Sequence, residues 1–115
     1  MTDHETEQEI QGKAAARITP ADIEASIASE YYFTADQAVE AADIGRMYPG
    51  NLCLLTFCIL IMHNGTKLVG INYGAIDPAQ HCAKRGREAA RKHAVEQIWP
   101  LLGYELRTKL AERTA

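Results

Sequence analysis

The side chains best suited to chemistry form a basic cluster in the second half of the sequence: Lys84, Arg85, Arg87, Arg91 and Lys92. Arg87 and Arg91 stand one helical turn apart, and Lys84 lies on the same side of a helical wheel. Two guanidinium groups at this spacing present planar forks of N–H donors, which suit a phosphate or a carboxylate. The sequence therefore predicts an anion-binding site formed by Arg87, Arg91 and Lys84.

The distribution of charge suggests a second interpretation of the two arginines. Residues 1–45 contain ten acidic and two basic residues, a net charge of −8, whereas residues 46–115 carry +5. In this alternative, Arg87 and Arg91 pair with acidic residues of the first two expected helices, namely Asp22, Glu24 or Asp36. The sequence alone leaves both interpretations open.

A few polar and aromatic side chains are candidates to complete a ligand site. Asn72 and Tyr73 end the second expected strand, and Trp99 and Tyr104 flank an expected break in the C-terminal helices. Aromatic rings can stack on a nucleobase, so we predict that Tyr73, Trp99 and Tyr104 contribute stacking contacts and Asn72 a polar contact. The alternative for Trp99 is that it fills one end of the core.

Catalytic and metal-binding motifs are absent from the sequence. Its three cysteines and four histidines show no metal-ligand spacing, and it has no nucleophile elbow, phosphate loop or paired-carboxylate signature. We therefore expect no enzymatic activity, no metal and no cofactor. No apolar stretch reaches the ~18 residues of a membrane span, so we also expect no membrane partner.

Two helices are expected near the N-terminus. Thr19 is a good N-cap, Pro20 fits the first helical position and Asp22 can complete a capping box, which predicts a helix from residue 20 to about 30–32. Thr34 is a second N-cap and predicts a helix over 35–42. Whether 31–34 forms a third strand is left open.

A β-hairpin occupies the middle of the chain. Asn64-Gly65 separates two β-rich runs, 52–62 and 67–73, and this dipeptide is a strong signal for a two-residue turn. If His63 pairs with Thr66, Gly70 shares a face with Phe57, Ile59 and Ile61, and Thr56 neighbours Tyr73. The first run is apolar on both faces, so both faces of the sheet must be covered.

The longest expected helix spans 78–98 and carries a stripe of small residues. We predict that Gly86, at the centre of this stripe, packs over Gly70. Pro100 is expected to stop the helix by forcing Trp99 into extended geometry, and a short last helix should follow over 104–110.

Together these elements predict an α+β fold with two N-terminal helices, a β-hairpin, a long C-terminal helix and a short final helix. Residues 18–115 form the single domain, and residues 1–17 form a flexible acidic tail. The helices cover one face of the sheet. A second copy of the chain is expected to cover the other, which makes the protein a homo-oligomer through its hairpin sheet.

Several segments together resemble a family of small tailed-phage proteins, named after the phage N-four product forty-nine and the phage Sf-six gene sixty-six. The segments are 18–27, 31–35, 55–60, 98–104, Asn64-Gly65, Gly70, Gly86-Arg87, Ala90-Arg91 and Ala94. The resemblance covers residues 18–110. It implies a phage genome, expression in the host bacterial cytoplasm and an accessory role, and it carries over no catalytic residues.

Two functions are compatible with these observations. The first is a non-enzymatic accessory protein that binds and neutralises a host factor in counter-defence, either a defence protein or a phosphorylated nucleotide signal held by the two arginines. The second is a nucleic-acid-associated protein of phage replication or transcription that uses the whole basic cluster.

Overall fold

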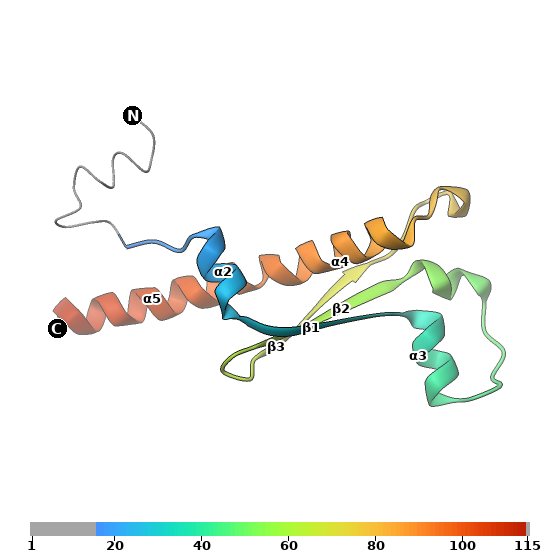
Figure 1. The fold of residues 1–115 in the computed structure, drawn as a ribbon, viewed down its shortest axis with the longest axis horizontal. Helices are drawn as coiled ribbons and strands as arrows, with labels where there is room; N and C mark the ends of the chain where they lie inside the picture. Colours follow the sequence, from blue (N-terminus) through green and yellow to red (C-terminus); the bar gives the residue numbers. More distant parts are fainter. Residues whose placement is uncertain (1–15, 115) are drawn as a thin grey trace.

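The computed structural model describes residues 16–114, so the expected tail, residues 1–17, lies almost entirely outside the described residues. The fold is α+β, as the sequence predicts, but the hairpin belongs to a three-stranded antiparallel sheet of order β1-β2-β3 (Figure 1). The elements are α2 (Pro20–Ser26), β1 (Ile27–Thr34), α3 (Ala35–Ala42), β2 (Thr56–Met62), β3 (Lys67–Asn72), α4 (Ala83–Glu96) and α5 (Ile98–Thr114), with short 3₁₀ turns η2 (Gly50–Leu54) and η3 (Pro78–Gln80).

Strand β1 replaces the second half of the first expected helix. The capping box forms as predicted, because the Thr19 backbone N–H donates to the Asp22 carboxylate at 2.8 Å. The helix nevertheless ends at Ser26, and the aromatic and β-branched run Tyr31–Thr34 joins a strand that pairs with β2. Ile23 and Ile27 are apolar and stand one helical turn apart. This spacing predicts a longer helix than the one that forms.

The hairpin register differs by one residue from the expected one. Ile61 pairs with Lys67, and the loop between Met62 and Thr66 has three residues, of which Gly65 adopts a positive φ of 89°. Because side chains alternate between faces, a slip of one residue moves every side chain of a strand to the other face. The predicted position of Gly70 is therefore wrong.

Two pairings change as a result of this register. Gly70 pairs with Cys58 and lies on the face that α4 covers, not with Phe57 and Ile59. Thr56 pairs with Asn72 rather than neighbouring Tyr73.

The small-residue stripe brings α4 into close contact with the sheet, as expected. A Cβ atom on Gly70 would lie 2.0 Å from the Ala90 carbonyl oxygen and 2.5 Å from the Ala94 backbone nitrogen. Gly86 does not pack over Gly70 but over Thr56, whose hydroxyl would lie 2.9 Å from a Cβ at position 86. The core between the helices and the sheet consists of Ile23, Cys58, Leu60, Met62, Ala90, Ala94 and Ile98.

Helix α4 also covers the outer edge of β3. The Ile71 N–H donates to Nδ1 of His93 at 2.8 Å, and Nε2 of Gln97 donates to the Val69 carbonyl at 2.7 Å. These backbone groups face away from β2 and would otherwise be free to pair with another strand. The helix therefore blocks one edge of the sheet as well as one of its faces.

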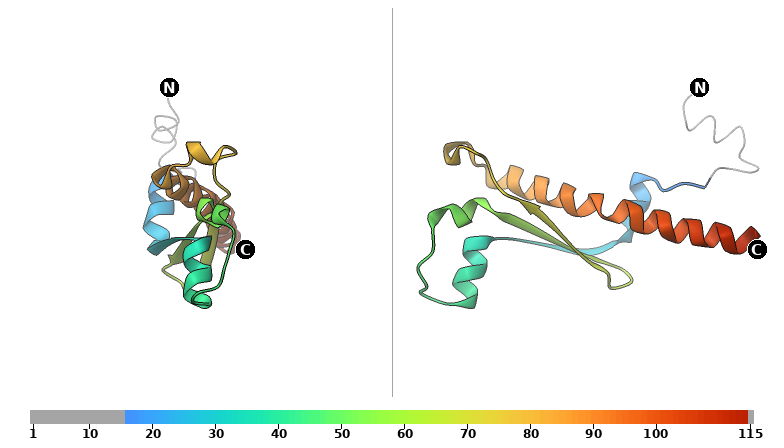
Figure 2. Two further views of the ribbon diagram at one scale, coloured as in Figure 1. Left: turned by 90° about the vertical axis from the view of Figure 1, so that its right-hand side faces the viewer. Right: turned by 180° about the vertical axis from the view of Figure 1, so that it is seen from behind.

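The C-terminal helices form an almost continuous rod (Figures 1 and 2). Gln97, between α4 and α5, keeps a helical conformation with φ −79° and ψ −15°. Pro100 does not stop the helix, because it lies in the first turn of α5, where a missing N–H removes no intrahelical bond. Helix α5 then runs through Gly103 to Thr114, far beyond the short helix expected.

We predict that Gly70→Ala destabilises the protein by ~1–3 kcal/mol or more, because the added methyl group would overlap backbone atoms of α4. Gly103→Ala is the matched control, and it should change the free energy of unfolding in the opposite direction. No atom lies within 4 Å of a Cβ at position 103, and alanine stabilises a helix interior by up to ~1 kcal/mol relative to glycine. Chemical unfolding of both variants measures the two effects, and an unperturbed Gly70→Ala protein would contradict the close packing.

Candidate binding surfaces

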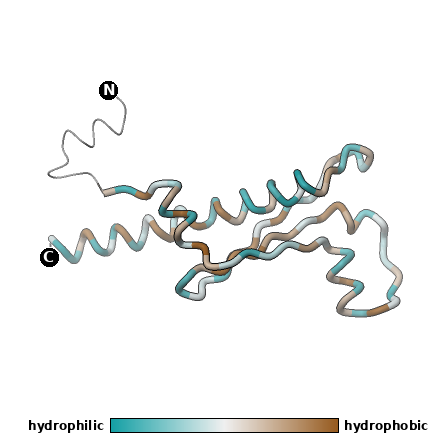
Figure 3. The backbone as a smooth tube through the Cα atoms, in the orientation of Figure 1, coloured by the Kyte–Doolittle hydropathy of each residue, from teal (hydrophilic) through white to brown (hydrophobic). Residues whose placement is uncertain are grey.

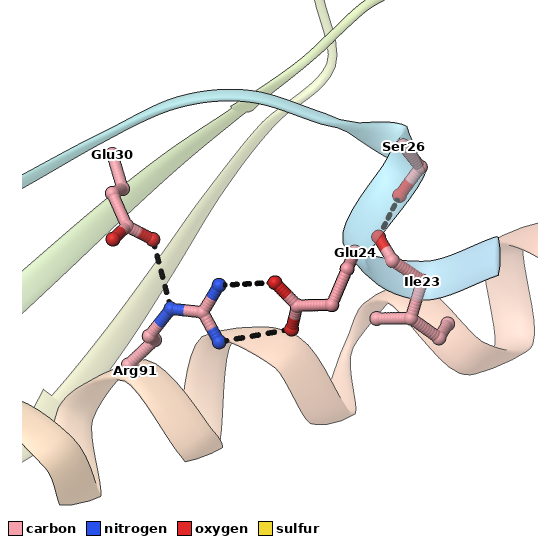
Figure 4. A network of polar contacts seen from close by, with 5 residues as sticks. All are labelled: Ile23, Glu24, Ser26, Glu30 and Arg91. Atoms are coloured by element: carbon pink, nitrogen blue, oxygen red, sulfur yellow. Dashed lines mark hydrogen bonds and ion pairs between the residues drawn. The ribbon is translucent and has the colours of Figure 1, made fainter. Parts of the chain in front are cut away.

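Arg91 is held by two of the protein's own carboxylates (Figure 4). Its terminal nitrogens donate to both oxygens of Glu24 at 2.8 and 3.1 Å, and its Nε donates to Glu30 at 2.8 Å. Glu24 belongs to α2, Glu30 to β1 and Arg91 to α4, so this ion-pair network joins three elements. The hydroxyl of Ser26, which donates to the Ile23 carbonyl at 2.6 Å, lies beside it in α2.

The electrostatics of this network follow from its geometry. Hydrogen bonding to Arg91 lowers the pKa of Glu24, and the two carboxylates in turn raise the pKa of Arg91. The Arg91 side chain is only 29% exposed, whereas Glu24 is 59% exposed. Arg91 therefore serves the fold in this structure, in agreement with the second interpretation of its sequence context.

The other two members of the predicted anion site are placed differently. Lys84 lies 4.0 Å from Glu88 on the solvent side of α4. Arg87, one turn before Arg91, has no ion-pair partner within residues 16–114 and lines a cavity. Among the three residues predicted, Arg87 thus retains a charged group that faces a space large enough for a ligand.

This cavity, which we call the Arg87 cavity, lies between the first turn of α4, the end of β1 and the start of α3. Its volume is about 230 Å³, and its lining consists of Tyr32, Phe33, Thr34, Gln37, Thr56, Ala83 and Arg87. Thr56 is only 2% exposed, and no buried side-chain oxygen or nitrogen of the described residues lacks a hydrogen-bond partner. Thr56 therefore brings a polar side chain to the wall of the cavity without leaving an unsatisfied buried group.

The remaining polar groups of the cavity are held in place locally. The Thr34 N–H donates to Oε1 of Gln37 at 2.9 Å, and the Thr34 hydroxyl donates to the Asp36 carboxylate. The amide NH₂ of Gln37 is thereby left as a donor. Burial raises the pKa of Tyr32 to about 12, and its protonated hydroxyl is already hydrogen-bonded to Cys58, so the available donors belong to Arg87, Gln37 and Thr56. The Arg87 cavity therefore offers several hydrogen-bond donors.

The predicted polar and stacking residues do not converge on this cavity. Asn72 lines a separate space of about 280 Å³ with His81, Cys82 and Arg85. Tyr73 follows β3 and is 76% exposed, whereas Trp99 and Tyr104 lie on α5. Trp99 lies 12 residues after Arg87, which corresponds to roughly 18 Å along a helix. No single ligand of nucleotide size can contact all four predicted residues and Arg87.

A second surface is the face of the sheet opposite α4. It is formed by the other parity of each strand, and we call it the open face: Ser29, Tyr31, Phe33, Phe57, Ile59, Ile61, Lys67, Val69 and Ile71. No described helix lies across it, because α4 contacts the Cys58 and Leu60 side. Hydrophobic colouring predominates along β2, whereas much of α4 is hydrophilic (Figure 3). The open face is thus an uncovered apolar surface.

Within residues 16–114 no cluster of three or more His, Cys, Asp or Glu side chains could hold a metal ion. The backbone N–H of Arg85 and its side chain lower the pKa of Cys82 at the start of α4, whereas burial raises that of Cys58. No helix in this part of the chain has the length and apolar composition to cross a membrane.

Sequence reasoning missed two features of these surfaces. The Arg87 cavity forms because Tyr32 and Thr34 lie in a strand. The sequence pattern predicts a helix through residue 30 instead, so it does not place these two side chains beside a cavity. Glu30 was not recognised as a partner of Arg91 for the same reason. The available signal was the run Tyr31–Thr34, whose residue types favour strands over helices.

We predict that Arg91→Ala lowers the free energy of unfolding at neutral pH by roughly 1 kcal/mol, since the pairs it removes are partly exposed and screened by solvent. Lys92→Ala is the control, because Lys92 is the next residue of the same helix, is exposed and has no ion pair within residues 16–114. Equal melting temperatures for the two variants would show that the network contributes nothing to stability.

The stability of the native protein and that of Arg91→Ala should also depend differently on pH. Because Arg91 lowers the pKa of Glu24 below its ordinary value of 4.5, this stabilisation is present above pH 4.5 and is lost as the pH falls through the lowered pKa. The difference in unfolding free energy between native protein and Arg91→Ala should therefore shrink on acidification. A difference that stays constant down to the acid transition would exclude Glu24 as the partner.

Comparison with known proteins identifies one family. The model of the Phage protein (N4 Gp49/phage Sf6 gene 66) family matches residues 18–110. No curated protein and no solved structure matches the chain. The match includes every strand and helix that forms the two surfaces. The resemblance predicted from the sequence is confirmed, and the chain belongs to the Phage protein (N4 Gp49/phage Sf6 gene 66) family.

Proposed function

We propose that this protein is a non-enzymatic phage accessory protein of the host bacterial cytoplasm that binds and neutralises a host factor in counter-defence. Of the two factors considered, a defence protein and a nucleotide immune signal, we favour a small phosphorylated signal. The observation that supports this choice is Arg87, which forms no ion pair within residues 16–114 and lines the Arg87 cavity together with the polar side chains of Thr56 and Gln37.

The donors around this cavity suit a phosphate group. Arg87 supplies a charged fork of N–H groups, Thr56 a hydroxyl and Gln37 an amide NH₂. The oxygens of a phosphate in the cavity can accept from these groups. Such groups bind and orient an anion, which is the expected property of a protein that sequesters its ligand.

The size of the cavity limits what it can enclose. About 230 Å³ is below the ~300–1,000 Å³ of typical small-molecule sites. A phosphate with part of its sugar would fit inside, and the base would lie at the rim, where Tyr32 and Phe33 provide aromatic rings. Tyr73, Trp99 and Tyr104 lie too far away for this role, so we assign them none in ligand binding.

A nucleic-acid role in phage replication or transcription remains the second candidate, and the exposed basic residues of α4 favour it. Lys84, Arg85, Arg87 and Lys92 are all exposed on this helix. Single-stranded or duplex nucleic acid would contact several of them through successive phosphates. The two candidates differ in the residues they require and in their response to salt.

Binding of nucleoside phosphates and cyclic dinucleotides, measured by calorimetry on the full chain, tests the proposal. Thr56→Val keeps the shape of the side chain but removes its hydroxyl, and Arg87→Gln removes the charge. Each lost charge-assisted bond should weaken binding by about 10- to 100-fold, because such bonds contribute ~1.5–3 kcal/mol. Lys92→Gln, on the solvent side of α4, should bind as the native protein does.

The alternative outcomes are distinct. If Lys92→Gln weakens binding as much as Arg87→Gln and the affinity falls steeply with salt, the ligand is a nucleic acid. If the native protein binds none of these probes, or if Thr56→Val and Arg87→Gln bind them normally, the Arg87 cavity is not a phosphate site.

A further inference from the structure

We propose that the open face of one protomer packs against the open face of a second copy of this chain. The two copies are related by a two-fold axis that crosses the strands, so that the hairpin end of each sheet lies over the α3 end of the other. The two surfaces share Phe33, which lines the Arg87 cavity and also belongs to the open face, and otherwise consist of different residues. The dimer does not require that the cavity binds phosphate.

The open face has the composition of a buried surface. Seven of its nine side chains are apolar or aromatic, and Lys67 is its only charged residue. Phe33 and Phe57 form a stacked cross-strand pair with ring centroids 5.1 Å apart. Tyr31 is nevertheless 56% exposed and Val69 44% exposed in the protomer. A partner sheet at the usual separation of about 10 Å would cover both.

The described helices leave the open face uncovered. The protomer is elongated, with a radius of gyration of 19.4 Å compared with about 13 Å for a compact domain of this length, because the rod of α4 and α5 extends beyond the sheet (Figure 1). Helices α2, α4 and α5 lie on one side of the sheet, while α3 projects from the other side at one end (Figure 2). No described segment folds back over the strands between α3 and the hairpin loop.

Charge favours a second copy over another partner and also selects the orientation. A nucleic acid would require cations that the open face lacks. Helix α3 carries Asp36 and Glu40 and no basic residue, whereas Lys67 begins β3 at the opposite end of the sheet. Asp43, which follows α3, already pairs with Arg46 at 3.4 Å. A two-fold axis across the strands brings each Lys67 towards the acidic α3 of the other copy. An axis along the strands would instead place both Lys67 side chains at one end of the dimer and both copies of α3 at the other.

The area of the open face sets the expected strength. Three strands of about seven residues span roughly 14 by 24 Å, so two copies cover on the order of 700 Å² of flat surface. Projecting side chains and α3 enlarge this area towards the lower end of the ~1,200–2,000 Å² of standard interfaces. We therefore expect a concentration-dependent dimer with a dissociation constant in the micromolar range.

Sedimentation equilibrium of the full chain, from low to several hundred micromolar, tests this proposal. Tyr31→Lys and Val69→Lys place a charge on the open face at positions that are already solvent-exposed in the protomer, so both variants should fold. Each should raise the dissociation constant by about a hundredfold or more, because an unpaired charge would be buried. Ile76→Lys is the matched control, since Ile76 is fully exposed and lies outside the open face.

A separate variant tests the orientation of the two copies in the dimer. Lys67→Glu should weaken the dimer, because it places a carboxylate against the acidic α3 of the partner copy. A native protein that stays monomeric over the whole range would overturn the proposal. So would Tyr31→Lys and Val69→Lys variants that associate normally, or an Ile76→Lys variant that is weakened equally. Normal association of Lys67→Glu would overturn the orientation of the two copies.

Discussion

The close approach of α4 to β3 is the constraint on which the rest of the structure depends. Gly70 has no room for a Cβ atom beneath Ala90 and Ala94, so a large side chain at any of these positions would push the helix away from the sheet. At this short separation His93 and Gln97 reach backbone groups at the edge of β3. One contact thus covers a face of the sheet, blocks one edge and fixes the direction of the rod formed by α4 and α5.

The two candidate surfaces are consequences of this arrangement. Helix α4 covers one face of the sheet, and only α3 projects from the other. The open face therefore lacks a cover within the described residues. The Arg91 network attaches α2 and β1 to the covered side, which leaves Arg87 as the arginine that faces a cavity. Both proposed binding roles therefore depend on which side chains the helix packing leaves available.

The sequence predicts the fold class, α3, the hairpin, the capping box at Thr19 and the small-residue stripe, because each has a strong local signal. It fails where a local signal conflicts with tertiary pairing. Residues 27–34 include types that favour helices and types that favour strands. Pairing with β2 makes this segment a strand. The loop after Asn64 forms with three residues instead of two, and this difference alone reverses the face of Gly70. Of the predicted site residues, Arg87 lies in a cavity with a buried polar group, but its neighbours Tyr32 and Thr56 could not be identified without the register.

The measurement that tests the two-sided packing of the sheet most directly is an isotope-filtered NOE experiment on a mixture of labelled and unlabelled full-length chains. Intermolecular contacts are expected among Phe57, Ile59, Ile61 and Val69, together with contacts from Lys67 to α3 of the other copy. Contacts from Leu60 or Ala90 should be intramolecular only, because α4 covers them in each protomer. Intermolecular contacts confined to α5 or absent at high concentration would contradict the packing of one open face on another.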